Sequence, residues 1–218
     1  MATPYLQVRL DQATSTQDVA RERLETIPVL VLTPVQTSGR GRVGSSWETA
    51  PRARAASLAV RRPASDRRPF SLMAGVAALR AVSGPRLKWP NDLMFGEGKV
   101  GGILVEQSGD EVVIGLGLNL WWPDAPEGAA ALFEEDSGPD RYAEIGAAWG
   151  AELMRLIESD GWPLSEYRSD CETLGRQITW EPDGSGTAID VSDAGGLVVE
   201  LASGGTATLT SGAVRHLR

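Results

Sequence analysis

The sequence predicts an α+β fold with a small β unit at its C-terminus, and three observations support this class. Short strand-like segments are interrupted by two long helical patterns, at residues 70–82 and 140–160. The segments KVGGILVEQ and EVVIGLGLNL are separated only by SGD, which predicts an antiparallel hairpin. From about Arg176 the chain changes to short alternating runs broken by Gly, Ser and Asp, which indicates an all-β unit.

The elements of the first half follow from their local patterns. Residues 6–10 predict a strand, and STQDVARERL predicts a helix with Ser and Thr as candidate N-caps. The apolar run VLVLT, residues 29–33, predicts a buried strand, and SLAV, residues 57–60, predicts the next one. FSLMAGVAALRAV, residues 70–82, is apolar on almost every side, which favours a helix packed between other elements.

The second half begins with LKW and a turn-prone PND, followed by the predicted hairpin. Apolar residues recur at helical spacing in residues 140–160, which predicts an amphipathic helix near the end of the first domain. The runs QITW, AIDV, LVVEL and TATL then indicate a small SH3-like barrel docked on that domain, because so small a unit buries little core alone. We expect a larger domain at residues 1–170 and an SH3-like domain at 171–218.

Composition and charge exclude several classes of protein. The formal net charge of −8 disfavours DNA as a partner, and no apolar run approaches the roughly 20 residues of a membrane-spanning helix. The N-terminus lacks the layout of a secretory signal, and Cys171, the single cysteine, cannot form an intramolecular disulfide. We therefore expect a soluble, cytoplasmic protein.

The loop GRGRVGSSW, residues 39–47, is suited to bind an anion. Its glycines allow close backbone approach, and Arg40 and Arg42 offer planar charged groups to carboxylate or phosphate oxygens. Trp47 offers a flat face on which a purine could stack. The loop fits neither the P-loop nor a dinucleotide-binding turn before a helix, so a surface turn with solvated arginines is the alternative.

Lysine is rare in this chain: only Lys88 and Lys99 are found among its 21 basic residues. Both lie in KWPNDLMFGEGKVGGILVE, residues 88–106, which indicates two places where a compact ammonium is needed instead of a guanidinium. GLGLNL, residues 115–120, predicts a strand whose glycines admit a ligand close to the backbone. It contains Asn119, whose side chain could hydrogen-bond an adenine edge.

These segments, together with Ser15 and Thr16 and in this order, closely resemble biotin protein ligases. The resemblance extends through CETLGRQITW and the β tail. It implies a mixed sheet with helices mainly on one face, as in biotin and lipoate ligases, and a site on the other face. It also implies activation of biotin with ATP and Mg²⁺ to biotinyl-5′-AMP, and transfer to a lysine of a biotin carboxyl carrier domain. Because the motifs begin at residue 15, no N-terminal DNA-binding domain is expected.

The resemblance also implies roles for single residues. The catalytic residues would be Lys99, Arg42 and Arg40. The biotin-binding residues would be Ser15, Thr16, Gln36, Gly39, Arg40, Arg42, Lys99, Gly102, Leu104 and Gly117. The nucleotide-binding residues would be Arg42, Trp47, Asn91, Asp92, Lys99 and Asn119. No metal-ligating residue is assigned.

The sequence differs from the family's usual pattern at three positions, and other functions are alternatives to this interpretation. The family often has asparagine in place of Gln17, and arginines in place of Val43 and Ser45. A lipoyl or octanoyl ligase or transferase of the same fold family is one alternative, and a non-catalytic biotin- or adenylate-binding module is another. Six arginines between residues 52 and 68 are either a docking surface for an acidic carrier domain or a solvated face, and the second interpretation is favoured. His216 and Cys171 are assigned no catalytic role.

Overall fold

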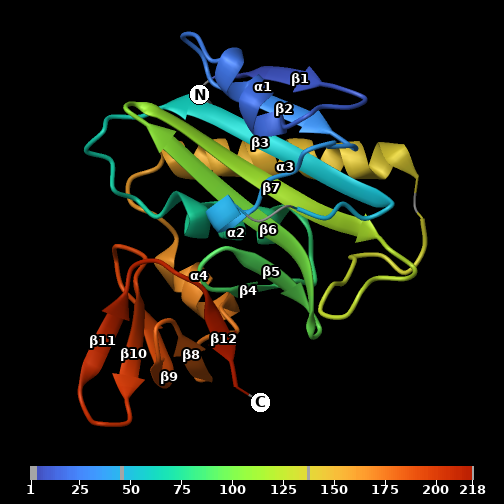
Figure 1. Ribbon diagram of the computed structural model, residues 1–218. Helices are drawn as coiled ribbons and strands as arrows, with labels where there is room; N and C mark the ends of the chain where they lie inside the picture. Colours follow the sequence, from blue (N-terminus) through green and yellow to red (C-terminus); the bar gives the residue numbers. More distant parts are fainter. Residues whose placement is uncertain (1–3, 45–46, 137, 218) are drawn as a thin grey trace.

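The computed structural model describes residues 4–44, 47–136 and 138–217. Its larger part is a seven-stranded mixed sheet in the order β1-β2-β3-β7-β6-β5-β4 (Figure 1). The outer pair β1 and β2 is parallel, and every other neighbouring pair is antiparallel. The strands are β1 (Leu6–Arg9), β2 (Val29–Thr33), β3 (Arg52–Arg61), β4 (Arg86–Lys88), β5 (Asp92–Phe95), β6 (Gly98–Ser108) and β7 (Glu111–Trp121).

Helices cover the two faces of this sheet unequally. Helices α2 (Phe70–Ala81) and α3 (Pro139–Glu158) pack on one face, which we call the core face, and α3 passes behind the sheet in Figure 1. Helix α1 (Thr16–Glu22) packs on the opposite face, near β2 and β3. Leu30 and Leu32 of β2 accordingly join the main core, while Val29 and Val31 join a small cluster under α1. Most of the second face is left to the cavity described below, so we call it the site face.

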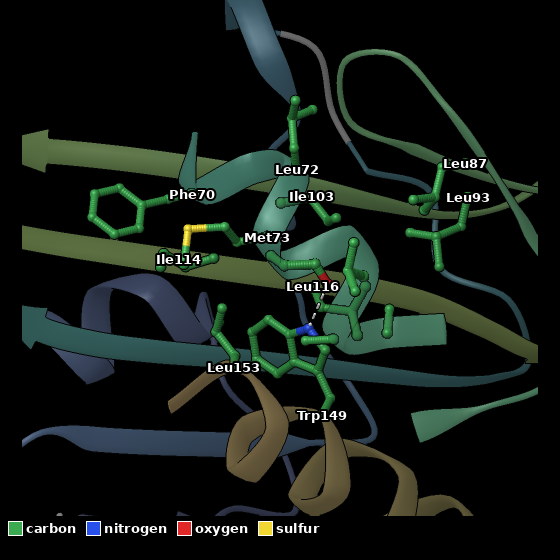
Figure 2. Packing of buried hydrophobic residues seen from close by; sticks show 14 of the residues in the cluster. Phe70, Leu72, Met73, Leu87, Leu93, Ile103, Ile114, Leu116, Trp149 and Leu153 are labelled. Atoms are coloured by element: carbon green, nitrogen blue, oxygen red, sulfur yellow. Dashed lines mark hydrogen bonds between the residues drawn. The ribbon is translucent and has the colours of Figure 1, made fainter. Parts of the chain in front are cut away.

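The main core lies between the sheet, α2 and α3. Met73 of α2 points toward Ile114 of β7, and Trp149 of α3 packs beside Leu153 (Figure 2). The fully buried Trp149 indole donates a hydrogen bond to the carbonyl of Ala74 at 3.1 Å, which ties α3 to α2. The expectation that residues 70–82 form a helix packed between other elements is confirmed, since this helix buries side chains on most of its surface.

Two glycines let α3 lie close to the sheet. A Cβ atom on Gly150 would collide with the side chain of Leu30, and one on Gly146 would lie 2.9 Å from Leu32 Cδ2. The two glycines are four residues apart, so they lie on the same side of the helix. The helix backbone therefore rests directly on two leucines of β2.

A second, five-stranded antiparallel sheet follows the short helix α4 (Leu164–Asp170). Its strands are β8 (Gln177–Trp180), β9 (Gly184–Val191), β10 (Leu197–Leu201), β11 (Thr206–Leu209) and β12 (Val214–His216), in the order β11-β10-β9-β8-β12. This unit is consistent with the expected SH3-like domain. The domain boundary at residue 170 stays a prediction.

The two sheets pack against one another through Trp89. This side chain is buried in the main core, and its indole donates a hydrogen bond to the carbonyl of Gly195 at 3.0 Å. The backbone N–H of Trp89 donates to Thr173 Oγ1 at 3.0 Å. Cys171, which lies between α4 and β8, is a free and buried thiol, and burial raises its pKa.

The structure extends or adds to the predicted elements where local patterns are short. The strand expected at 57–60 runs over all of β3, while β5, α4 and β12 were not predicted. These three elements contain seven residues or fewer each, too few for a clear period. The PND turn joins β4 to β5 as expected. Among the described residues, no helix has both the length and the apolar content needed to span a membrane.

Candidate active site

A cavity of about 400 Å³ opens on the site face. Its walls come from six parts of the chain: the start of α1, residues 36–42 with Trp47, β3, residues 91–92, β6 with β7, and the turn before β12. The lining residues are Ser15, Thr16, Gln17, Gln36, Arg40, Gly41, Arg42, Trp47, Ala56, Ser57, Asn91, Asp92, Lys99, Gly102, Ile103, Leu104, Gly115, Leu116, Gly117, Gly212 and Ala213.

Glycines form the floor of this cavity. Gly102 of β6 and Gly117 of β7 are register partners, and the indole of Trp47 lies against their bare backbone. A Cβ atom on Gly117 would lie 2.8 Å from Trp47 Cε2, and one on Gly102 would lie 3.1 Å from Trp47 Cζ3. Any larger residue at either position would push the indole away from the sheet. The glycine spacing of the two strands therefore makes the space in which Trp47 sits.

Lys99 and Asp92 form an ion pair beside this indole. The Lys99 Nζ atom is 2.6 Å from Asp92 Oδ1 and 5.7 Å from the centre of the Trp47 ring. Both charged side chains are partly exposed, at 37% and 23%. The Lys99 ammonium is thus held by a carboxylate and by an aromatic face, which fixes a positive charge at the cavity wall.

Asn91 holds Arg42, the second cation on the cavity wall. Its Nδ2 donates to the carbonyl of Ile103 at 3.0 Å, which leaves Oδ1 to accept from Arg42 Nη1 at 3.0 Å. Arg42 also donates to the carbonyl of Gly212 at 3.1 Å. Arg42 begins the short 3₁₀ helix η1 (Arg42–Gly44), so one guanidinium connects the loop, the PND turn and the C-terminal unit.

Arg40 lies at the rim and pairs with carboxylates. It donates two hydrogen bonds to Asp18, at 2.7 and 2.8 Å, and one to Glu106 at 3.3 Å. Arg21 of α1 also contacts Glu106, at 2.8 Å. The hydrogen bonds from Arg40 are the main reason why the pKa of Asp18 is lowered from its ordinary value.

Another part of the cavity lining, which we call the polar end, is polar and uncharged. Gln36 Oε1 accepts hydrogen bonds from the backbone N–H of Thr16 at 2.8 Å and from Thr16 Oγ1 at 3.0 Å. Thr16 Oγ1 also lies 2.7 Å from the hydroxyl oxygen of Ser57, which is buried. Ser15 is the N-cap residue of α1, yet its buried side chain makes no capping hydrogen bond.

Most of the predicted site residues line this one cavity, and Gly39 and Asn119 do not. The carbonyl of Gly39 accepts from the backbone N–H of Trp47 at 2.9 Å, so Gly39 closes the loop behind the indole. Asn119 follows Gly117 by two residues and therefore faces the same side of β7. It is buried, donates to the carbonyl of Ala130 at 3.2 Å, and keeps Oδ1 without a partner among the described residues. Contact between Asn119 and adenine stays a prediction.

The sequence did not single out several lining residues. Ser57 carried a usable signal, because it is a polar residue inside an apolar strand, and Gly115 belongs to the glycine spacing of GLGLNL. Gln17 was noted only as a departure. Gly212 and Ala213 carried no signal, since nothing local indicates that a turn of the C-terminal unit reaches the cavity. Ser45 and the side chain of Val43 lie outside the described residues.

The arginines between residues 52 and 68 are largely paired within the chain. Arg52 contacts Asp136 at 2.8 Å, Arg61 contacts Asp110 at 3.0 Å, and Arg68 contacts Asp66 at 2.8 Å. The pKa of Asp66 is lowered far below its ordinary value, chiefly by hydrogen bonds from Arg68. This pairing argues against a docking surface for an acidic carrier domain. Arg54 is buried, so the six arginines do not form one solvated face either.

Comparisons with known proteins identify the family of this chain. The model of the biotin/lipoate A/B protein ligase family matches residues 10–119. The biotin–[acetyl-CoA-carboxylase] ligase of Mycobacterium tuberculosis is 32% identical over 214 residues, covering 87% of this chain and 79% of that protein. The bifunctional ligase/repressor BirA of Bacillus spizizenii is 30% identical over 149 residues, covering 59% of this chain and 46% of that protein.

One solved structure is similar to this chain over nearly its whole length. The biotin protein ligase from Aquifex aeolicus in complex with biotin and ATP superimposes with a TM-score of 0.77 and 25% identity, covering 98% of this chain and 99% of that chain. The mixed sheet, the helices gathered on its core face and the second antiparallel sheet are thus those of a known ligase fold. The chain therefore belongs to the biotin/lipoate A/B protein ligase family, and within it to the biotin protein ligases.

Proposed function

We propose that this chain is an ATP-dependent biotin–protein ligase that forms biotinyl-5′-AMP and transfers the biotinyl group to a lysine of a biotin carboxyl carrier domain. The observation that carries the proposal is the pair of cations, Lys99 and Arg42, that Asp92 and Asn91 hold on the wall of one cavity. The cavity has a polar uncharged end for the ureido ring and a glycine floor for the tail. The family membership and the similar ligases support this assignment.

In the first step, the biotin carboxylate attacks the α-phosphorus of ATP. The bond from this phosphorus to the bridging oxygen breaks, pyrophosphate leaves, and a mixed anhydride forms. Negative charge is concentrated where the carboxylate meets the α-phosphoryl oxygens, so fixed positive groups there stabilise the transition state. Lys99 and Arg42 would supply these charges without first having to be ordered, because their partners already hold them.

Arg40 would join the same anionic centre from the loop. A guanidinium binds carboxylate and phosphate oxygens in the same two-pronged manner. Its pairing with Asp18 can therefore be exchanged for pairing with a substrate anion. Trp47 would stack on the adenine, and Asn119 would bind the adenine edge with the Oδ1 atom that has no partner among the described residues.

Mg²⁺ would enter with ATP as part of the substrate. No group of three or more His, Cys, Asp or Glu side chains in the described part of the chain is placed to hold a metal ion. Asp92 is the one acidic side chain among the described residues that line the cavity. Asp92 already pairs with Lys99, so the substrate phosphates would hold the Mg²⁺ and no residue of this chain is assigned to it.

In the second step, the ε-amine of a carrier lysine attacks the anhydride carbonyl. An amide bond forms, AMP leaves with the electrons of the broken C–O bond, and the amine proton passes to solvent. Water must be kept from the anhydride until the carrier arrives, and the loop at residues 39–47 would cover it. Activation of lipoate or octanoate is not favoured, because an apolar acyl chain makes no hydrogen bonds to the polar end formed by Thr16, Gln36 and Ser57.

The test is biotin-dependent exchange of labelled pyrophosphate into ATP. Lys99→Ala is expected to lower the exchange rate by about 10²–10³, the usual cost of removing one preorganised charge-stabilising group. Lys88→Ala is the matched control, since Lys88 is the other lysine and does not line the cavity. Exchange with lipoate or octanoate in place of biotin would support the alternative ligase. Biotin binding without pyrophosphate exchange would contradict the enzyme and would indicate a non-catalytic binding module.

A further inference from the structure

Thr173 is a fully buried polar residue that lies outside the cavity lining, between α4 and β8. Its hydroxyl oxygen accepts a hydrogen bond from the backbone N–H of Trp89 at 3.0 Å and lies 3.1 Å from His216 Nε2. Because burial lowers the pKa of His216 to about 4, the ring is neutral at pH 7, and Nε2 can accept the hydroxyl proton. One hydroxyl group therefore joins the segment after β4 to the last strand of the second sheet.

The first partner of this hydroxyl leads to Arg42 through the PND turn. Trp89 is followed by Pro90 and Asn91, and Asn91 Oδ1 accepts a hydrogen bond from Arg42 Nη1 at 3.0 Å. The ring of Pro90 fixes one backbone angle of the connection, and Trp89 itself is buried. A shift of the Trp89 backbone is therefore passed on to the side chain of Asn91.

The second partner leads to the same arginine from the C-terminal unit. His216 ends β12, and the pairing of β12 with β8 fixes the backbone of this strand. Gly212 lies just before β12, and its carbonyl accepts a hydrogen bond from Arg42 Nη1 at 3.1 Å. The nitrogen atom that Asn91 holds is thus also held by the C-terminal unit. The two supports of this atom are joined again, away from the cavity, at the hydroxyl of Thr173.

We infer that Thr173 is a positioning residue for the activation of biotin, an inference that rests on the proposed function. Its hydroxyl holds the segment that leads to Asn91 against the strand that follows Gly212, and so sets the place of the Arg42 guanidinium. Stabilisation of the transition state depends on where such a charge is fixed. A displacement of about 1 Å, caused by a change far from the reacting atoms, can lower a rate about 100-fold.

The test is the steady-state kinetics of biotin-dependent pyrophosphate exchange, measured on the full chain. Thr173→Val keeps the shape of the side chain but removes the hydroxyl, and it is expected to lower kcat about tenfold. The KM values for ATP and biotin should change less than about twofold, because the lost placement matters mainly in the transition state. Thr173→Ser restores the hydroxyl and should keep kcat within about twofold of the unaltered chain. An equal loss in Thr173→Ser would overturn the role of the hydroxyl.

A double-mutant cycle shows whether the effect passes through Arg42. In an Arg42→Ala background, Thr173→Val is expected to lower the exchange rate by less than about a further twofold, because the guanidinium that it displaces is already absent. A tenfold further loss in that background would overturn the inference, since the change would then reach the cavity by another route.

Two further variants separate positioning from stability. Val199→Ala opens a cavity in the core of the C-terminal unit, so it lowers stability without removing the hydroxyl, and it should keep kcat. Thr173→Ala also removes the hydroxyl and is measured beside Thr173→Val, with a loss of kcat expected in both. Failure of both of these variants to fold would overturn the inference, because the hydroxyl would then serve stability.

The outcomes distinguish the inference from the proposed function. An unchanged kcat in Thr173→Val and Thr173→Ala would overturn the role of Thr173 and leave the ligase assignment intact. Absence of biotin-dependent exchange by the unaltered chain would overturn the proposed function, and the inference with it.

Discussion

Asn91 and Asp92 show how a tight turn can organise charge in a site. Each follows the short strand β4, and each holds one cation of the cavity wall, Arg42 or Lys99. Their side chains are short, and Asn91 is fixed in turn by the carbonyl of Ile103. Short, fixed partners keep the two cations in place with little loss of freedom on substrate binding. The PND segment thus contributes to the site by positioning charge.

A second single residue, His216, is expected to make the stability of the protein depend on pH. Its ring lies 3.1 Å from Thr173 Oγ1, and burial lowers its pKa to about 4, with Lys88 and Arg176 acting in the same direction. The unfolded chain binds a proton below about pH 6.5, while the folded chain resists protonation until about pH 4. The contribution of the neutral His216 ring to the free energy of unfolding is therefore fully present above pH 6.5. It is lost as the pH falls toward 4.

The measurement is the free energy of unfolding in urea at pH 7 and pH 5. His216→Gln should remove on the order of 1–2 kcal/mol of the decrease over this interval. The lowered pKa values of Asp18 and Glu152 act at lower pH. Burial raises the pKa of Glu172, whose carboxylate lies 3.8 Å from His216 Nδ1, so this group acts in the opposite direction as the pH falls, and Glu172→Gln is measured beside His216→Gln to separate the two. An equal decrease in both proteins would show that the imidazole is not responsible.

At the scale of elements, glycines set two separations in this fold. Gly102 and Gly117 leave room for an indole on the site face, and Gly146 and Gly150 let α3 approach the core face. The same residue type thus serves binding on one side of the sheet and packing on the other. In both places a methyl group would have to displace a neighbouring side chain.

Gly150→Ala is expected to destabilise the protein although alanine is the better helix former. The added methyl collides with Leu30, and overpacking of this kind costs about 1–3 kcal/mol, while helix propensity returns at most about 1 kcal/mol. Ala148→Gly, on the exposed side of α3, is the control for the propensity term and should cost about 1 kcal/mol. Urea unfolding measures both. A stabilised Gly150→Ala variant would show that the helix can move away without cost.

At the scale of the whole molecule, the C-terminal unit is part of the cavity. Gly212 and Ala213 line it, and the carbonyl of Gly212 accepts a hydrogen bond from Arg42. The buried contact of Trp89 with Gly195 holds the two sheets together behind the site. The position of the C-terminal unit therefore bears directly on the position of a proposed catalytic arginine.

Trp89→Phe should weaken this attachment. It leaves the buried carbonyl of Gly195 without its donor, at a cost of about 2–3 kcal/mol in the free energy of unfolding. Trp162→Phe is the matched control, because its indole donates to Asp193 in the same turn but in an exposed setting, where water replaces it. The control should lose less than about 1 kcal/mol. Hydrogen exchange in residues 184–201 should accelerate in Trp89→Phe alone, and equal losses would contradict the proposed attachment.

Features of the structure that depend on residues close together in the sequence are predicted well, and contacts between residues far apart in the sequence are not. Strands β2, β8, β10 and β11 have the predicted bounds, because burial and alternation are local properties of the chain. The glycine, arginine and lysine motifs indicate an anion-binding site, and most of the residues that the resemblance names line one cavity of the structure. The pairing of Arg40 with Asp18 and Glu106, and the approach of Gly212 to Arg42, join residues far apart in sequence. Such contacts depend on tertiary packing, which no local pattern encodes.

The burial of Cys171 has a practical consequence for spectroscopy. A thiol with a raised pKa and almost no exposed surface reacts slowly with maleimides at neutral pH. A cysteine introduced at the exposed Ser38, next to the loop at residues 39–47, would therefore be the one readily labelled position, with the native cysteine left in place. A fluorophore attached there would report loop movement near Trp47 in real time as each substrate is added.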